Sequence, residues 1–328
     1  MLAATNKQAK VVIGRDGRIS GSMVNQLVIQ SLIGLGLEVI DLGLSTTPTV
    51  EMAVVWEKAD GGIIITASHN PKEWNALKLL NNEGEFISAE AGAQVLDIAA
   101  KESFTYVPVD RLGSVTTKND YLEKHIEAVV HYPLVDVAAI KARNLTVVVD
   151  AVNSTGALAV PPLLKALGVE QVVTLNGEVN GRFAHNPEPL PENLVALSTE
   201  VKKSGASMGI AVDPDVDRLC FVCEDGSMFG EEFTLVAVAD YVLSQRPGNT
   251  VSNMSSTKAL KEITLEKGGA YFPSPVGEVN VVKKMKAENA VIGGEGNGGI
   301  IVPDFHYGRD ALIGIALSLR LSRNIKTG

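Results

Sequence analysis

The sequence predicts an α/β fold made of three similar units in a row. Runs of β-branched residues typical of strands alternate with segments of helical apolar spacing along the whole chain. The pattern restarts twice within 328 residues, a length that exceeds a single hydrophobic core. We therefore expect three α/β domains with ligand-binding loops at the carboxyl ends of strands, at residues 1–113, 114–229 and 230–328.

The first unit has a clear alternation of elements. Strands are expected at residues 10–16, 37–43, 61–67 and 77–81, and helices at 20–36, 49–59 and 90–101. A polar stretch at residues 107–119, with Pro108, Gly113 and consecutive threonines, predicts a domain boundary.

The second and third units follow the same alternation. In the second, helices are expected at residues 120–130 and 157–168, and strands at 145–152, 170–176, 208–213 and 218–225. In the third, helices are expected at 233–245, 258–268 and 310–322, and strands at 250–255 and 290–294.

Composition excludes several classes of protein. A net charge of −9 lacks the basic face that nucleic-acid binding requires, so no nucleic-acid partner is expected. No apolar run approaches the roughly eighteen residues of a membrane span. The start, MLAATNKQAK, has no apolar stretch with a cleavage site. We expect a soluble cytoplasmic protein with no membrane partner.

The two cysteines, Cys220 and Cys223, form a CxxC pattern that can indicate a redox or zinc site. The surrounding RLCFVCED is typical of a strand, on which residues three apart point to opposite faces. We therefore expect unpaired structural thiols.

Three aspartates, Asp213, Asp215 and Asp217, alternate in VDPDVDRLC between two apolar strands. Alternate positions of an extended chain face the same side, so the carboxylates repel one another unless a cation joins them. Oxygen ligands favour a hard ion, and we expect Mg²⁺. An EF-hand is excluded because Arg218 stands where that loop needs glycine. A solvated acidic turn is the alternative.

The glycine-rich stretch GGEGNGG, residues 293–299, follows an expected strand. Glu295 at its centre would repel phosphate, and no GK[ST] ending follows. Glu295 and Asn297 are suited to hydrogen bonds with sugar hydroxyls, and an ordinary glycine-rich turn has equal support.

The segment GRDGRISG, residues 14–21, places Arg15 and Arg18 just before a helix. Two guanidinium groups at a helix start can form an anion site. A surface turn paired with Asp16 has equal support.

The strand at residues 61–67 ends in TASHNP, whose polar residues serve neither strand formation nor packing. A Ser-His hydrolase dyad is disfavoured because adjacent side chains diverge. Ser68 is instead suited to carry a phosphoryl group near a cation and arginines. Ordinary helix or loop positions are expected for His125, His131 and His185, and His306 stays undecided.

The motifs TASHNP, DPDVDR and GEGNGG occur in this order at strand ends of three successive units, and together they resemble the α-D-phosphohexomutases. The resemblance covers essentially the whole chain. It implies three α/β domains with mixed sheets and an active site in the cleft between them. It also implies that Ser68 is the phosphoserine and contributes to the Mg²⁺ site together with Asp213, Asp215 and Asp217.

Further roles near the phosphoryl group follow from the same resemblance. His69 and Arg15 would be catalytic, and Arg218 would lie near the phosphoryl group as a substrate-binding residue. NALK is similar to the family pattern N-G-x-K, which makes Lys78 the candidate general acid or base. Ala76 departs from the usual glycine of that pattern.

Substrate-binding roles are also implied. The segment SPVGE, which contains Gly277, resembles the loop that distinguishes sugar epimers. Glu295 and Asn297 would hold the sugar hydroxyls, and Arg18 belongs to the segment that resembles the family's arginine loop.

The family commonly has GExSGH where this chain has GEGNGG, so Asn297 replaces a serine and Gly299 a histidine. This form resembles the branch of phosphoglucosamine mutases and bifunctional phosphohexomutases of archaea and some bacteria. The expected enzyme is an isomerase that interconverts 6-phospho and 1-phospho sugars through a bisphosphate. Phosphoglucosamine mutase is the first expectation, and phosphomannomutase or phosphoglucomutase is the alternative.

The expected partners are a phosphosugar substrate, a hexose bisphosphate activator and, in a homodimer, a second copy of the chain. A non-catalytic phosphosugar-binding protein and a phosphatase are competing functions. The family's opening segment and its fourth domain with an SGTE loop have no counterpart here. Severely reduced turnover is therefore expected of this chain alone, because a distal phosphate clamp contributes positioning.

Overall fold

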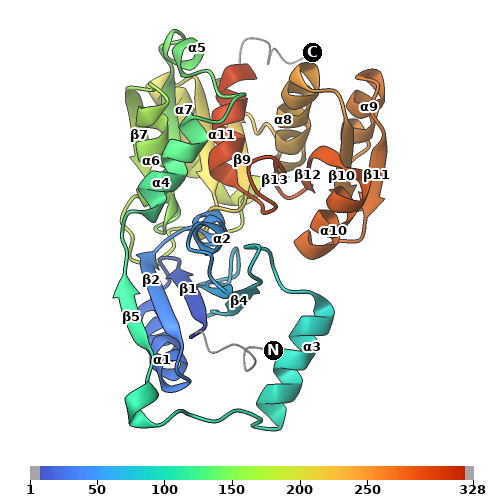
Figure 1. The fold of residues 1–328 in the computed structure, drawn as a ribbon. Helices are drawn as coiled ribbons and strands as arrows, with labels where there is room; N and C mark the ends of the chain where they lie inside the picture. Colours follow the sequence, from blue (N-terminus) through green and yellow to red (C-terminus); the bar gives the residue numbers. More distant parts are fainter. Residues whose placement is uncertain (1–7, 322–328) are drawn as a thin grey trace.

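Three separate β-sheets, each accompanied by helices, make up the computed structural model (Figure 1). The structure describes residues 8–321. Most of the segment on which the targeting expectation rests, residues 1–10, lies outside the described residues. The predicted α/β class with three consecutive units is confirmed, and each sheet is mixed because one antiparallel strand joins parallel ones.

The first sheet has five strands in the order β4-β3-β1-β2-β5. The strands β1, β2, β3 and β5 run parallel, and β4 is antiparallel to β3. The elements of this part are β1 (Lys10–Arg15), α1 (Gly21–Gly34), β2 (Glu38–Leu44), α2 (Thr47–Trp56), β3 (Gly61–Ile65), β4 (Leu77–Leu80), α3 (Ala89–Ala100) and β5 (Ser114–Thr117). Helix α3 contributes no buried side chain and stands apart from the sheet in Figure 1.

Strand β5 lies beyond the boundary expected at residue 113. Its residues pair with Glu38–Asp41 of β2, so they extend the first sheet. All four of its side chains are exposed, because an edge strand needs no apolar face, and the polar sequence therefore gave no strand signal. We propose that the first domain ends after Thr117.

The second sheet has the order β7-β6-β8-β9, with β9 antiparallel to β8. Helix α6 packs on one face beside β6 and β7, and α7 packs against β6, β8 and β9. The elements are α4 (Tyr121–Val130), α5 (Val137–Lys141), β6 (Thr146–Asp150), α6 (Gly156–Ala166), β7 (Gln171–Leu175), α7 (Val195–Ser204), β8 (Met208–Val212) and β9 (Leu219–Cys223).

The third sheet has the order β11-β10-β12-β13, with β13 antiparallel to β12. Its elements are α8 (Glu231–Gln245), β10 (Asn249–Asn253), α9 (Ala259–Glu266), β11 (Tyr271–Ser274), α10 (Glu278–Glu288), β12 (Ala290–Glu295), β13 (Gly299–Ile301) and α11 (Ala311–Leu321).

One hydrophobic core spans the second and third units. Helix α11, drawn in red in Figure 1, packs against α8 and also against α4 and α6. Its buried side chains, such as Leu312 and Ile315, share a cluster with Leu163 of α6 and Val238 of α8. The relative position of the second and third sheets is therefore fixed by apolar contacts.

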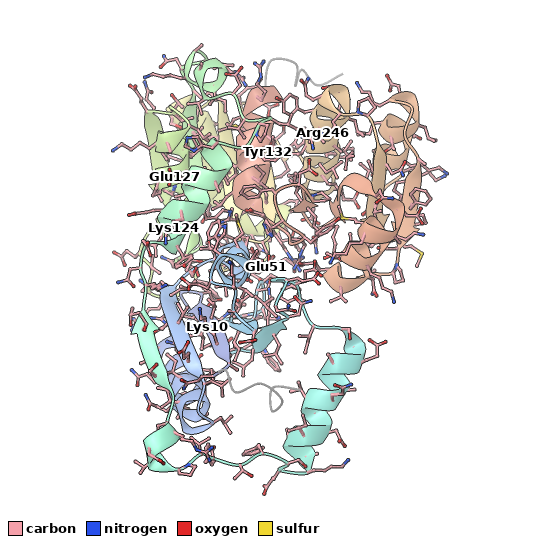
Figure 2. The ribbon with its side chains drawn as sticks, viewed as in Figure 1. Lys10, Glu51, Lys124, Glu127, Tyr132 and Arg246 are labelled. Carbon is pink, nitrogen blue, oxygen red and sulfur yellow. The ribbon has the colours of Figure 1, made fainter. Side chains whose placement is uncertain are left out.

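Helix α2 connects the first sheet to the rest of the molecule. It packs on β1 and β3 and also contacts α4. Because neighbours surround it, the eight residues Thr47–Val54 are all buried, including Glu51, which is labelled near the centre of Figure 2.

Cys220 is buried, Cys223 is half-buried, and both are free thiols, as expected. Over residues 8–321, no helix combines the length and the hydrophobicity needed to cross a membrane.

Candidate active site

Three strand ends bring the sequence motifs together. Ser68 follows β3, Asp213 follows β8, and Glu295 is the last residue of β12. A side-chain hydrogen bond joins the first two segments, and Arg309 bridges the second and third through Asp217 and Glu295, although the three come from different sheets. The site therefore lies at the carboxyl ends of these strands, as the parallel pairings predict.

Ser68 has a strained backbone and a well-placed hydroxyl. Its φ of +48° lies in the left-handed region, which is unusual for a residue other than glycine. Its Oγ donates to Oδ2 of Asp213 at 2.7 Å, and Nδ1 of His69 lies 3.3 Å from the same Oγ. Strained residues concentrate at functional sites, so this geometry supports a chemical role for Ser68.

Arg18 shapes the loop that carries Ser68. Its side chain is 1% exposed. Its Nε donates to Asp16, and its terminal nitrogens donate to four backbone carbonyls, those of Ser68, Asn70, Pro71 and Trp74. All five guanidinium N–H donors are therefore used. This geometry does not favour the substrate-binding role expected of Arg18, because its N–H donors are used and the residue is buried.

The acidic loop is buried and compact. One oxygen from each of Asp213, Asp215 and Asp217 lies within 4.8 Å of the others, and all three residues are fully buried. Val216 has a φ of +64°, an outlier for a β-branched residue. The backbone N–H groups of Asp217 and Arg218 donate to Oδ1 of Asp213 at 3.1 Å. The loop therefore turns its carboxylates inward.

Lys78 of β4 contacts two of these carboxylates. Its Nζ lies 2.7 Å from Oδ2 of Asp215 and 3.1 Å from Oδ2 of Asp217. Burial lowers the pKa of Lys78, but the two carboxylates more than offset it, and the net pKa lies above its ordinary value. Thr47 of α2 also donates to Oδ2 of Asp215, at 2.6 Å.

The unpartnered oxygens of the acidic loop fit a metal ion. Within residues 8–321, Oδ1 of Asp215 and Oδ1 of Asp217 are buried and have no hydrogen-bond partner. Unsatisfied buried carboxylate oxygens are costly unless a cation binds them. Three clustered carboxylates are a hard, all-oxygen donor set, which suits Mg²⁺. The acidic loop is therefore able to hold a divalent cation.

The charges around the three carboxylates are unequal. Burial raises the pKa of Asp213, and the charges of Asp215 and Asp217 raise it further. Burial also raises the pKa of Asp217, but the Arg309 and Lys78 charges outweigh burial, and the net pKa is below its ordinary value. The basic side chains thus act more strongly on Asp217 than on Asp213.

His69 and Arg218 meet at a residue that the sequence did not single out. Glu188, in the loop before α7, lies 4.0 Å from Nε2 of His69 and 3.7 Å from Nη1 of Arg218. Burial lowers the pKa of His69, and the positive charge of Arg218 lowers it further. Nε of Arg218 is buried and has no partner among the described residues. His69 also contacts Ser68, so this cluster lies beside the serine.

The glycine-rich segment has its carboxylate already in use. Oε1 of Glu295 accepts from Asn253 Nδ2 at 2.9 Å and from the Gly277 backbone N–H at 3.0 Å. Its Oε2 accepts from Arg309 at 3.0 Å. Asn297 is half-buried and its Oδ1 accepts from the Gly299 N–H. A hydrogen bond therefore joins Gly277 to Glu295, two residues that the sequence analysis named separately.

Arg309 is a residue of the site that sequence reasoning missed. It binds Asp217, Glu278 and Glu295 and thereby connects the acidic loop to the third sheet. It lies in FHYGRDA, the segment that also contains His306, and no role was expected of it. The sequence showed only a charged residue just before an apolar helix, and the structure shows that this residue is 7% exposed.

A cavity opens beside Ser68 and Lys78. Its volume is about 440 Å³, which is in the range of small-ligand sites, and its walls come from residues 66–78. Arg15 lies at the end of β1, opposite Ile65 of β3. The one hydrogen bond of its side chain to the described residues runs from Nη1 to the Asp16 carbonyl at 3.2 Å, so other N–H groups are left for an anion.

The histidines behave differently from one another. His125 is fully buried on α4, where Nδ1 lies 2.8 Å from Thr49 Oγ1 and Nε2 lies 2.9 Å from Asp310. His306 also contacts Asp310, at 3.1 Å, and lies 3.5 Å from Glu51 of α2. These polar contacts fasten α2 to the segment before α11.

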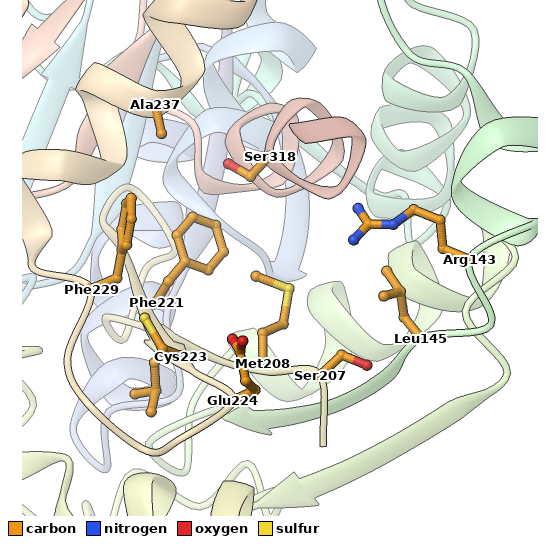
Figure 3. A pocket seen from close by; sticks show the side chains of 11 residues that line it. Arg143, Leu145, Ser207, Met208, Phe221, Cys223, Glu224, Phe229, Ala237 and Ser318 are labelled. Atoms are coloured by element: carbon orange, nitrogen blue, oxygen red, sulfur yellow. The ribbon is translucent and has the colours of Figure 1, made fainter. Parts of the chain in front are cut away.

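A second cavity, of about 310 Å³, lies at the far end of β8 (Figure 3). Met208, Phe221, Phe229 and Leu145 contribute to its walls, and Arg143 stands at one side. Asp213 follows the opposite end of β8, and none of the predicted site residues lines this cavity.

Family models match along nearly the whole chain. The description "Phosphoglucomutase/phosphomannomutase, alpha/beta/alpha domain I" matches residues 1–106, domain II matches 123–226, and domain III matches 231–327. A solved phosphoglucomutase/phosphomannomutase family protein from Burkholderia thailandensis superposes with a TM-score of 0.86 and 29% identity. That superposition covers 97% of this chain and 69% of the other.

Two curated relatives are similar over almost all of this chain. A phosphoglucomutase/phosphomannomutase from Thermococcus kodakarensis is 40% identical over 92% of this chain and 65% of its own length. A protein named as a probable phosphoglucosamine mutase, from Methanopyrus kandleri, is 34% identical over 95% of this chain and 68% of its own. The chain thus spans about two thirds of the length of these relatives. By sequence and by fold, the chain belongs to the phosphoglucomutase/phosphomannomutase family.

Proposed function

We propose that this chain carries the phosphoserine centre of a phosphohexomutase, which interconverts 6-phospho and 1-phospho sugars through a bisphosphate. The observation that carries the proposal is the contact between Ser68 Oγ and Asp213, beside two carboxylate oxygens without partners. A hydroxyl of this kind is in place to receive a phosphoryl group next to a cation site.

Each site residue has a stated task in the proposal. In one direction the P–O bond of phosphorylated Ser68 breaks and a bond to a sugar hydroxyl oxygen forms. Lys78 Nζ is proposed as the general acid or base at that oxygen. Because burial lowers its pKa less than Asp215 and Asp217 raise it, Lys78 would accept the hydroxyl proton only when a cation on these carboxylates weakens the two ion pairs. When the bisphosphate has turned round, its other phosphoryl group passes to Ser68 Oγ, and Lys78 protonates the departing sugar oxygen. The serine is thereby restored to its phosphorylated form.

The cation site supports this chemistry through charge. Asp213, Asp215 and Asp217 would hold Mg²⁺ together with an oxygen at Ser68, and the ion would supply positive charge for the phosphoryl oxygens. Arg218, which follows Asp217, and His69, which contacts Ser68, would bind phosphoryl oxygens, and Arg15 would add donors from the end of β1.

We assign the sugar loop to Glu295, Asn297 and Gly277. The glycine-rich pattern favours glucosamine phosphate, and the names of relatives such as the Methanopyrus kandleri protein support this choice. Mannose phosphate and glucose phosphate are the alternatives. We also propose a hexose bisphosphate as activator, a homodimer and a cytoplasmic location, which free thiols at Cys220 and Cys223 support.

Transfer of radiolabel from a hexose 1,6-bisphosphate to Ser68 tests the proposal. One labelled site per chain, lost in Ser68→Ala, is the expected result. Absence of label on the folded wild-type chain would leave phosphosugar binding without transfer as the function. A panel of glucosamine, mannose and glucose 6-phosphates then identifies the sugar, and release of free phosphate without isomer would indicate a phosphatase.

A further inference from the structure

One arginine side chain joins the acidic loop to the third sheet. Arg309 lies just before α11 and is buried, with a contact on each of its three guanidinium nitrogens. Nη2 donates to Oδ2 of Asp217 at 2.7 Å, Nε to Oε2 of Glu278 at 2.7 Å, and Nη1 to Oε2 of Glu295 at 3.0 Å. The three acceptors are carboxylates from three separate segments.

Two of these carboxylates organise the sugar loop. Glu278 is the first residue of α10, directly after Gly277. Oε1 of Glu295, the oxygen that does not bind Arg309, accepts from the Gly277 N–H and from Asn253 Nδ2. The guanidinium therefore links the end of β12 to the start of α10.

Neutral contacts also hold these regions together. The Leu219 N–H donates to the Gly298 carbonyl at 3.1 Å, and the Ala311 N–H donates to the Val216 carbonyl at 3.2 Å. Such backbone bonds fix distances but do not respond to a change of charge at Asp217. Arg309 does respond, because one positive charge is divided among three buried carboxylates.

The unpartnered Oδ1 of Asp217 connects the sharing of the Arg309 charge to cation binding. Oδ2 of Asp217 is held by Arg309 and Lys78, whereas Oδ1 is buried without a partner in the described part of the chain. A cation on Oδ1 draws the charge of Asp217 away from the guanidinium. Arg309 is then bound more strongly by Glu278 and Glu295.

We propose that Arg309 is a positioning residue that transmits cation binding at the acidic loop to the sugar loop around Gly277 and Glu295. The inference rests on the proposed function, because it uses the cation site assigned there. It adds a specific expectation. Binding of the divalent cation should reduce the mobility of the sugar loop even when no sugar is bound. By reciprocity, any ligand that reduces the mobility of the sugar loop should strengthen cation binding.

Gly299 provides a second way to disturb Arg309. A Cβ at this position would lie 2.3 Å from Cδ of Arg309 and 3.0 Å from its Cγ. Arg309 is held at its far end by three ion pairs, so it cannot swing aside freely. Gly299→Ala therefore displaces the guanidinium without removing its charge, while Arg309→Lys keeps the charge and loses the planar fork.

Amide hydrogen exchange of the 328-residue chain, with and without Mg²⁺ as the only added ligand, tests the proposal. In the wild type, Mg²⁺ is expected to slow exchange around residues 213–218 and also around 274–280 and 293–297. The slowing of exchange at residues 274–280 and 293–297 should be at least about fivefold, the lower end of typical coupling between sites. In Arg309→Lys and Gly299→Ala, only the effect at residues 213–218 should remain. Arg246→Lys, an exposed ion-pair partner of Asp304, is the matched control and should behave as the wild type.

Each result decides the question. Distant protection that survives in both variants shows that another contact carries the signal and overturns the inference. Protection confined to residues 213–218 in the wild type shows that no signal exists and also overturns it, while the proposed cation site stands. If Mg²⁺ gives no protection at residues 213–218 in the wild type, the proposed cation site is wrong, and the proposed function and the inference both fail. If one variant does not fold, the other supplies the comparison.

Discussion

Ser68 and Asp213 are 145 positions apart in the sequence, yet the serine Oγ donates a 2.7 Å hydrogen bond to Oδ2 of the aspartate. The bond joins the first sheet to the second and sets the proposed phosphoryl acceptor against the acidic loop. It also explains why a serine with a φ of +48° is retained there, since the strain is held by neighbouring contacts. Removal of either partner should thus change chemistry more than folding.

Ser68→Ala is expected to abolish incorporation of label from a hexose bisphosphate. The stability loss should be about 1 kcal/mol, the value of one hydrogen bond, because the side chain has little packing to lose. Labelling and a thermal melt measure the two effects. Ser204→Ala, which removes an exposed hydroxyl bonded to the Glu200 carbonyl, should label normally. Full labelling of Ser68→Ala would show that the acceptor is elsewhere.

Mg²⁺ is expected to raise the thermal midpoint of the wild-type chain, because the unfolded chain does not assemble the three carboxylates. At a hundredfold excess over Kd the gain is about 2.7 kcal/mol. In Asp215→Asn the gain should be mostly lost, while metal-free stability changes little because mutual repulsion also falls. Asp225→Asn, in an exposed turn, serves as control. A large drop in the metal-free midpoint of Asp215→Asn would contradict this account.

Lys78→Met should make the chain depend on metal for its stability. The variant removes the ammonium from Asp215 and Asp217 and leaves three buried carboxylates together. A loss of about 2 kcal/mol is expected without metal, less than for a fully buried pair because Lys78 is partly accessible. Mg²⁺ should recover more stability than it adds to the wild type. Lys203→Met, an exposed pair with Glu200, should lose less than about 0.5 kcal/mol. Equal Mg²⁺ gains in wild type and Lys78→Met would refute the idea.

The local signals in the sequence were sufficient for most elements, although not for β5, and for the acidic loop. Asp213, Asp215 and Asp217 alternate between strands, and that spacing alone predicts convergence, which the structure confirms. The strand that ends before Ser68 was equally clear, since β-branched residues stop abruptly at a polar motif.

Long-range partners were not predictable from one sequence. Arg309 meets Glu278 at a separation of 31 residues and Asp217 at 92, and nothing local in FHYGRDA indicates either. Glu51 has the pattern of a solvent-facing helix residue, but α2 is covered on both sides and the carboxylate is 1% exposed. Arg15 and Arg18 are three apart, and only the structure shows that Arg18 turns inward.

His185 should give the chain a pH-dependent part of its stability. Its Nδ1 faces the Asn186 carbonyl and its Nε2 faces Asp150 at 3.0 Å, so both nitrogens need a proton. Burial lowers the pKa of His185, but the Asp150 contact outweighs burial and the net pKa is raised. Stability from this pair is therefore full below the unfolded-state pKa of about 6.5 and is lost as pH rises through the higher folded-state value.

Denaturant unfolding at several pH values from about 5.5 to 8.5, bracketing that unfolded-state pKa, measures the effect. His185→Gln is expected to be less stable than the wild type at the acidic end and closer to it at the alkaline end. His131→Gln removes an exposed histidine whose ring bonds to the Glu127 carbonyl of its own helix and is the matched control. If the difference in the free energy of unfolding between His185→Gln and the wild type grows with pH, this prediction is wrong.

The last prediction concerns Arg18, which holds the Ser68 loop from inside. Its five N–H donors reach Asp16 and four carbonyls between Ser68 and Trp74, and a lysine offers only three donors from one point. Arg18→Lys should therefore leave at least two acceptors unpaired and shift the loop. A displacement of about 1 Å can cost roughly a hundredfold in rate, and that loss is expected for labelling of Ser68.

Mg²⁺ affinity separates this loop effect from general damage. Arg18 makes no contact with Asp213, Asp215 or Asp217 in the described structure, so Arg18→Lys should bind Mg²⁺ within about twofold of the wild type, as expected for distant independent sites. Arg111→Lys, at an exposed position, should match the wild type in both labelling and Mg²⁺ affinity. Wild-type labelling by Arg18→Lys would show that the carbonyl contacts do not position Ser68. An equal collapse of labelling and Mg²⁺ binding would show that Arg18 stabilises the whole site rather than the serine loop.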